Sequence, residues 1–271
     1  MLSATEAVIG RHRALTIGAL IVLTLLAWAW LVSGAGMGMQ PRVSLWPGFA
    51  SDPAMPGMAM GGAIEPAMAW PADRMLLTLS MWWVMMVAMM LPSAAPMMLL
   101  YARTASHGQA SPRPDTASFL AGYLIAWGAF SLLATLLQLL LETVDLLAPM
   151  LMASQSRWLS AGILLSAGLY QISPLKDVCL RHCRSPARFL SQHYRPGRVG
   201  ALRMGLLHGT YCVGCCWLLM ALLFVGGVMN LAWIALLTLM VAAEKLLPFG
   251  RIVALASGLA CMGWGTAILL G

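Results

Sequence analysis

Residues 118–141 read SFLAGYLIAWGAFSLLATLLQLLL and contain no charged side chain along their whole length. An α-helix needs about 20 consecutive apolar residues to cross the hydrocarbon core of a bilayer, and this run is long enough. Similar apolar runs occupy residues 14–33, 75–100, 157–175, 202–225, 228–247 and 252–270. The seven runs predict an all-α fold, a polytopic transmembrane helix bundle of about seven spans.

The composition of the whole chain supports this class. Of its 271 residues, 61% are hydrophobic and only 9% are charged, whereas an ordinary soluble domain carries about 25% charged residues. A soluble globular fold, a disordered chain and a secreted disulfide-rich miniprotein are therefore excluded. The net charge of +7 follows the ends of the apolar runs instead of forming one basic face with interleaved aromatics, so we expect no nucleic-acid binding.

The positions of the basic residues predict the topology. Seven of the 16 Lys and Arg residues lie between Lys176 and Arg203, and cytoplasmic segments of membrane proteins carry an excess of these residues. We therefore expect a cytoplasmic N-terminus and a multi-pass location in a bacterial inner (plasma) membrane, with the first run retained as a signal anchor. The predicted units are an N-terminal tail and first span (1–33), a Met/Gly/Pro-rich extracytoplasmic loop (34–74) and a six-helix membrane domain (75–271), which includes a basic, Cys-containing cytoplasmic loop at 176–201.

The fifth apolar run contains the strongest candidate for a chemical site. On a helix that turns ~100° per residue, His208, Cys212, Cys215 and Cys216 share one stripe about 100° wide. Thiolates and imidazole are ligands that suit Cu(I), zinc and iron–sulfur centres. Cysteine is also a small apolar residue that is often buried for packing alone. Glycines in the same run would allow a neighbouring helix to approach closely.

The second apolar run is rich in methionine. Met81, Met85 and Met89 lie in one row of i, i+4 positions, and Met86 and Met90 form an adjacent row. Thioethers are soft ligands that favour Cu(I), although methionine is also an adaptable packing residue. We predict that these rows face the Cys/His stripe of the fifth run across one buried site, with Met85 or Met89 as a fourth ligand.

The basic segment contains a second group of soft ligands, Cys179, His182 and Cys183. The two cysteines are four residues apart, a spacing that places both on one face of a helix. They could bind or exchange a metal ion, or remain unpaired thiols in a cytoplasmic loop. Glu244 and Lys245 end the sixth run, where a lysine can extend to the lipid headgroups; a proton or metal relay is the alternative for this pair. No motif for a catalytic triad, a zinc protease or ATP binding appears, so no enzymatic activity is assigned.

Several motifs resemble those of a known family. They are MMLPSAAPM at 89–97, the stretch from Tyr170 through Cys179 and Cys183 to Pro186, and the helix from Gly205 to Trp217, followed by Asn230 and the Glu244–Lys245 pair. In these residues, about 75–250, the chain resembles bacterial proteins described as predicted metal-binding integral membrane proteins (domain of unknown function 2182). The resemblance implies metal binding and supplies no reaction, transport direction or ligand set.

The predicted function is the binding of a soft transition metal for transport, delivery or homeostasis. Copper is preferred, with zinc and iron as alternatives, because the candidate ligands are thiols, thioethers and imidazole. The expected partners are the lipid bilayer and a metal chaperone or a metalloenzyme that receives the metal, and the oligomeric state stays open. Two alternatives remain: a membrane thiol–disulfide redox protein that uses Cys212, Cys215 and Cys216, and a membrane scaffold or assembly subunit without a metal.

Overall fold

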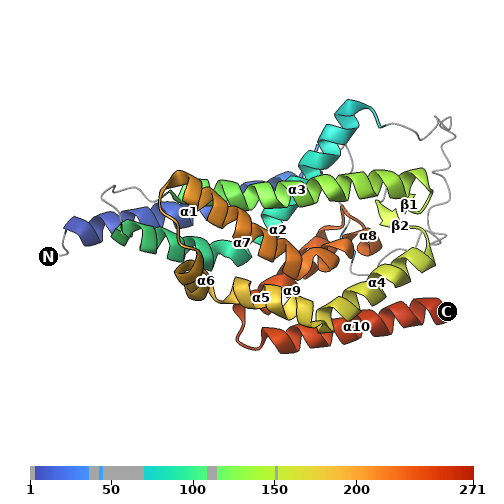
Figure 1. Ribbon diagram of the computed structural model, residues 1–271. Helices are drawn as coiled ribbons and strands as arrows, with labels where there is room; N and C mark the ends of the chain where they lie inside the picture. The colour runs from blue at the N-terminus through green and yellow to red at the C-terminus, as the bar shows by residue number, and fades with distance from the viewer. Residues whose placement is uncertain (1–3, 37–42, 45–69, 109–114, 150–151) are drawn as a thin grey trace.

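The computed structural model describes residues 4–36, 43–44, 70–108, 115–149 and 152–271 (Figure 1). These residues are almost entirely helical, which confirms the all-α prediction. Most of the predicted loop at 34–74, with all of its methionines, lies outside the described residues. The elements are α1 (Ala4–Val32), α2 (Ala72–Gly108), α3 (Thr116–Thr143), β1 (Leu147–Ala148), β2 (Ala153–Ser154), α4 (Arg157–Ile172), α5 (Pro174–Arg184), α6 (Pro186–His193), α7 (Gly197–Ala221), α8 (Leu223–Gly226), α9 (Leu231–Leu246) and α10 (Gly250–Leu270).

Five helical segments of the described chain are long and apolar enough to cross a membrane: Ala14–Val32, Ala72–Thr104, Thr116–Thr143, Gly197–Gly226 and Gly250–Leu270. The other two predicted runs, 157–175 and 228–247, form α4 and α9, which have 16 residues each. At 1.5 Å per residue each is about 24 Å long, shorter than the ~30 Å hydrocarbon core. The prediction of about seven spans is thus supported for five of them.

The contact between α3 and α7 depends on glycine. A Cβ atom at Gly205 of α7 would collide with the backbone carbonyl of Phe119 on α3, and a Cβ at Gly122 of α3 would collide with that of Leu202 on α7. Small residues at such positions let two helix backbones approach closely. The sequence predicts that the glycines of the fifth run admit a neighbouring helix, and the structure shows that α3 is this neighbour.

The basic segment at 176–201, predicted as a loop between two spans, is largely helical. It contains most of α5, all of α6 and the beginning of α7. Ser173 caps α5 by accepting a hydrogen bond from the Lys176 amide, and Pro174 occupies the first turn of the helix. Pro186 likewise occupies the first turn of α6, but the Ser185 side chain before it makes no capping hydrogen bond. A Ser-Pro pair favours a helix start because proline has no N–H that would need a partner at that position.

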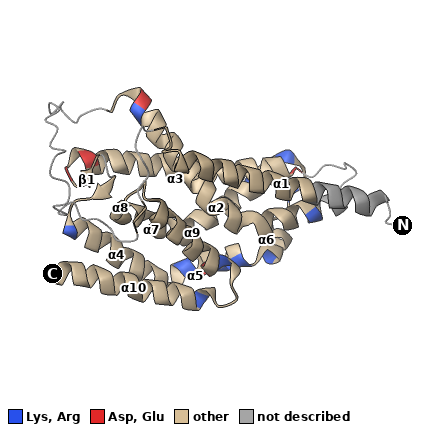
Figure 2. Cartoon of the chain, turned by 180° about the vertical axis from the view of Figure 1, so that it is seen from behind, with Lys and Arg blue, Asp and Glu red and all other residues tan. Residues whose placement is uncertain are grey.

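Charged residues concentrate at the two ends of the bundle (Figure 2). Lys and Arg residues gather at α5, α6 and the beginning of α10. At the other end, Glu142 on α3 forms a 2.8 Å ion pair with Arg74 on α2. Here β1 and β2 form a two-stranded antiparallel ladder in which Leu147 is opposite Ser154. The chain therefore has one strongly basic end and one end with mixed charge.

Candidate metal centre

Sulfur atoms from three helices gather inside the bundle. Cys212, Cys215 and Cys216 on α7 are each 1% exposed. The Cys183 thiol of α5 lies 4.0 Å from Cys215 Sγ, and the Met90 thioether of α2 lies 3.9 Å from Cys216 Sγ. We call these five residues the sulfur cluster. It joins one residue of the basic segment and one residue of the methionine rows to the stripe of the fifth run.

Polar groups surround Cys212. The Lys245 ammonium donates hydrogen bonds to Cys212 Sγ at 2.9 Å and to the Ser93 hydroxyl at 3.3 Å. The Tyr123 hydroxyl is hydrogen-bonded to the same thiol at 3.2 Å. Lys245 is only 7% exposed, so the expectation that it extends to the headgroups was wrong. The physical reason is that a buried ammonium needs polar partners, and the thiol and hydroxyl groups of neighbouring helices supply them.

Glu244, the residue before Lys245, belongs to a second buried polar network. Its carboxylate accepts hydrogen bonds from Lys176 Nζ at 2.5 Å and from Gln171 Nε2 at 2.6 Å. Lys176 also donates to the Gln171 amide oxygen, and Gln171 reaches Ser257 on α10 at 2.7 Å. Lys176 has no exposed surface. The network connects α4, α5, α9 and α10 next to the sulfur cluster.

His208 lies on the same helix as the three α7 cysteines and is 2% exposed. Its ring is 6.0 Å from that of Tyr123, 6.2 Å from that of Phe119 and 5.4 Å from that of Phe189, measured between centroids. Its Nδ1 has no hydrogen-bond partner within the described residues. Such a buried, unpaired nitrogen is costly, so His208 remains a candidate ligand beside the cluster.

Cys179, His182 and Cys183 all contact α7. Cys183 belongs to the sulfur cluster, and Cys179 lies beside it against Gly214. His182 stacks on Tyr211, with ring centroids 4.2 Å apart, and its Nδ1 is 2.8 Å from the Val178 carbonyl oxygen. Hydrogen bonding to the Cys212 and Cys215 thiols raises the pKa of Cys183 well above its ordinary value, and burial raises the pKa of Cys179.

The methionines of the two predicted rows on α2 are deeply buried. Met85, Met86 and Met90 have no exposed surface and Met89 is 1% exposed. Of these four, Met90 is the one whose sulfur contacts a thiol of α7. The other three belong to the hydrophobic core. Within the described residues, no group of three or more His, Cys, Asp and Glu side chains has an arrangement that could hold a metal ion.

Comparison with known protein families assigns the chain to one of them. The family described as PpoB2, copper chaperone, matches residues 79–268, which is more than half of the chain. The chain belongs to the PpoB2 copper chaperone family. No curated protein and no solved structure matches it.

The part of the chain that matches the PpoB2 family runs from Leu79 in α2 to Ile268 in α10. It contains every residue of the sulfur cluster, the partners of Cys212 and the Lys176–Glu244 pair. Helix α1 and the segment at 34–74 lie outside it. Membership in this family supports a copper-related function, and it agrees with the metal-related family that the sequence motifs resemble.

Proposed function

We propose that this protein is an integral membrane copper chaperone that binds Cu(I) in the sulfur cluster and transfers it to a partner protein. The observation that carries the proposal is the convergence of thiols and a thioether from α2, α5 and α7 in the buried interior. Thiolate and thioether sulfur are the ligands that select Cu(I) over hard cations. The cargo is thus matched by the chemistry of the side chains that surround it.

The spacing of the sulfur atoms suits a shared ion. Sulfur binds zinc at about 2.3 Å, and two sulfurs at this distance from one ion can be at most ~4.6 Å apart. The separations of 4.0 Å for Cys183–Cys215 and 3.9 Å for Met90–Cys216 are both below this limit. A small movement of these side chains would allow a soft ion to bridge either pair.

Binding of Cu(I) has to displace protons from the thiols. The pKa of Cys183 lies well above its ordinary value, so this thiol is protonated at neutral pH, whereas a metal-bound cysteine is deprotonated. The bond to the proton breaks as the copper–sulfur bond forms, and the copper keeps its oxidation state. Affinity for Cu(I) is therefore expected to fall as the pH falls, and copper uptake is expected to release protons.

The location completes the proposal. The chain would lie in a bacterial inner membrane as about seven spans, with α4 and α9 packed between longer helices and the N-terminus in the cytoplasm. The basic end at α5 and α6 (Figure 2) supports this orientation, because positive charge marks cytoplasmic segments. Cys183 would then provide access from the cytoplasmic side, where a metal chaperone or a metalloenzyme exchanges copper with the cluster.

Copper titration of the purified full chain tests the proposal. In detergent under reducing, oxygen-free conditions, a chromophoric Cu(I) chelator competes with the protein for the metal. We expect the Cys212→Ser/Cys215→Ser double variant to lose affinity by at least about tenfold, which corresponds to ~1.4 kcal/mol. Cys261→Ser is the matched control, because Cys261 lies on α10 outside the cluster. Equal Cu(I) affinity of the double variant and the control would contradict the proposal. Selective binding of zinc or iron by the purified protein would assign that metal to the site in place of copper.

The contact between Cys183 and Cys215 also favours a second candidate function, thiol–disulfide exchange with a partner. Their sulfur atoms are 4.0 Å apart, so modest movement would allow a bond of about 2.05 Å. In that case the two thiols would be oxidised by the disulfide of a partner, which is reduced to two thiols. Thiol counting before and after addition of an oxidised small-molecule disulfide distinguishes the candidates: loss of two thiols without any copper affinity would favour redox exchange.

A further inference from the structure

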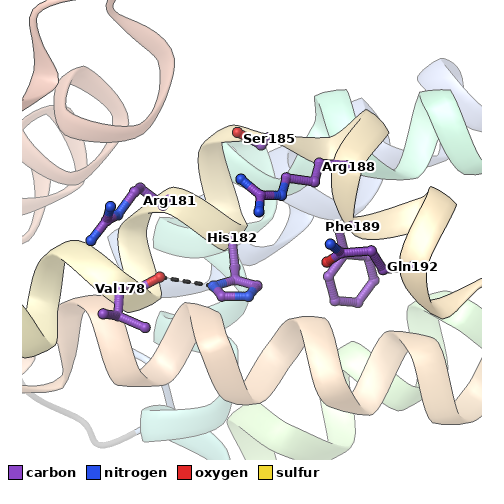
Figure 3. A pocket seen from close by; sticks show the side chains of 7 residues that line it. All are labelled: Val178, Arg181, His182, Ser185, Arg188, Phe189 and Gln192. Atoms are coloured by element: carbon purple, nitrogen blue, oxygen red, sulfur yellow. Dashed lines mark hydrogen bonds between the residues drawn. The ribbon is translucent and has the colours of Figure 1, made fainter.

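A surface pocket of about 220 Å³ lies at the junction of α5 and α6, apart from the sulfur cluster (Figure 3). Its polar lining comes from Arg181 and His182 on α5, Ser185 at the junction, and Arg188 and Gln192 on α6. The Arg188 guanidinium extends across the pocket towards His182 (Figure 3). None of the residues that line it in the described chain is acidic.

The two arginines lack a counter-ion. Within the described residues, neither Arg181 nor Arg188 forms an ion pair. Arg181 Nε donates a hydrogen bond to the backbone carbonyl of Asp177 at 3.3 Å, but the carboxylate of Asp177 is paired with Arg251 at 2.8 Å. The pocket therefore presents two uncompensated positive charges, and guanidinium groups bind phosphate with paired hydrogen bonds.

The beginning of α6 adds donors to the same pocket. Ser185 precedes the helix and its side chain makes no capping hydrogen bond, so the hydroxyl is available to a ligand. The first-turn amides of a helix lack internal partners, and the helix dipole favours an anion at this end. His182 is held on the pocket wall by its stack on Tyr211. The pocket thus combines two guanidinium groups, a hydroxyl and a helix N-terminus.

The outer face of α5 indicates where the anion comes from. Leu175 is 69% exposed and Val178, which also lines the pocket, is 47% exposed. Exposed apolar residues beside arginines are typical of a helix that lies in the headgroup region of a membrane. Basic pockets among membrane helices on the cytoplasmic side bind anionic headgroups. We infer that this pocket binds the phosphate group of an anionic lipid headgroup, a site independent of copper binding.

Thermal unfolding of the full chain in a neutral detergent tests the inference. Phosphatidylglycerol is expected to raise the Tm of the wild-type protein in a saturable manner, because it binds the folded state. For the Arg181→Gln/Arg188→Gln variant, the lipid concentration that gives half of the maximal increase in Tm should be at least about tenfold higher. The control, Arg195→Gln/Arg203→Gln, removes the same charge from two exposed residues, one in the basic segment and one on α7, that do not line the pocket, and it should behave as the wild type.

Three further measurements complete the test. Arg188→Lys retains the charge without the paired hydrogen bonds and should show an intermediate affinity. If inorganic phosphate raises the Tm by the same amount at the same concentrations as the lipid, the ligand is free phosphate and the assignment to a lipid headgroup is wrong. An equal effect of phosphatidylcholine, or equal weakening in the pocket variant and the control, would overturn the site.

Discussion

Met90 is the side chain through which α2 contacts the thiols of α7. Its sulfur lies 3.9 Å from Cys216 Sγ, and its backbone carbonyl accepts a hydrogen bond from Tyr123, which is also bonded to the Cys212 thiol. The position of Met90 is thus defined by a direct contact with Cys216 and by a hydrogen bond from Tyr123, which in turn contacts Cys212. This makes it the strongest candidate in α2 for a thioether ligand.

At the residue scale, we predict that Met90→Leu weakens Cu(I) binding about tenfold, since leucine retains the apolar volume but has no sulfur. The exchange should cost less than ~1.5 kcal/mol of stability. Met81→Leu is the matched control, because Met81 is equally buried on the same helix. The Cu(I) affinity of both variants is measured by competition with a chelator. Equal affinities would mean that Met90 acts in packing only.

At the scale of the elements, the buried pair of Lys176 and Glu244 connects α5 to α9. Their side chains are 0% and 2% exposed and 2.5 Å apart. Through Gln171 the same network includes α4, and through Ser257 it includes α10. Because Lys245 follows Glu244 directly, a change in this network is expected to move the ammonium that contacts Cys212. We therefore expect the network to hold the Lys245 ammonium in place beside Cys212.

We predict that Glu244→Gln is strongly destabilising, by about 3–5 kcal/mol, because it leaves the buried Lys176 ammonium without a counter-charge. The Lys176→Met/Glu244→Leu double variant should be much closer to the wild type, since no unpaired charge remains. Denaturation in detergent measures the stability of Glu244→Gln, and denaturation of the wild type, Lys176→Met, Glu244→Leu and the double variant, combined as a double-mutant cycle, measures the coupling. A double variant that loses as much stability as the two single changes together would refute the role of this pair.

At the scale of the whole molecule, the ends of the bundle differ in charge, and this difference predicts the orientation in the membrane. In a background without the native thiols, a cysteine introduced as Ala187→Cys on α6 should resist an impermeant thiol reagent in intact cells. Val144→Cys, at the opposite end, should react. Both positions are exposed, so accessibility within the protein does not differ. Labelling at position 187 and not at position 144 would reverse the proposed topology.

The sequence by itself determined the all-α class, the long apolar helices and the shared face of Cys212, Cys215 and Cys216. These features follow from local properties, because the length and hydropathy of a run decide whether it can span a bilayer and helical periodicity decides which residues share a face. The Ser-Pro pairs at 173–174 and 185–186 also carried a local signal for α5 and α6.

Only the tertiary structure decided which faces meet. The contact of Cys183 with Cys215, the contact of Met90 with Cys216 and the burial of Lys245 beside Cys212 all join residues that are distant in sequence. Periodicity cannot predict such contacts, because they depend on how helices rotate and slide against one another. Glycines allow α3 to approach α7 closely. Lys176 and Lys245 can lie inside the bundle because buried carboxylate, thiol and hydroxyl groups of other helices pair with their ammonium groups. The sulfur cluster exists because packing brings three helices to one place.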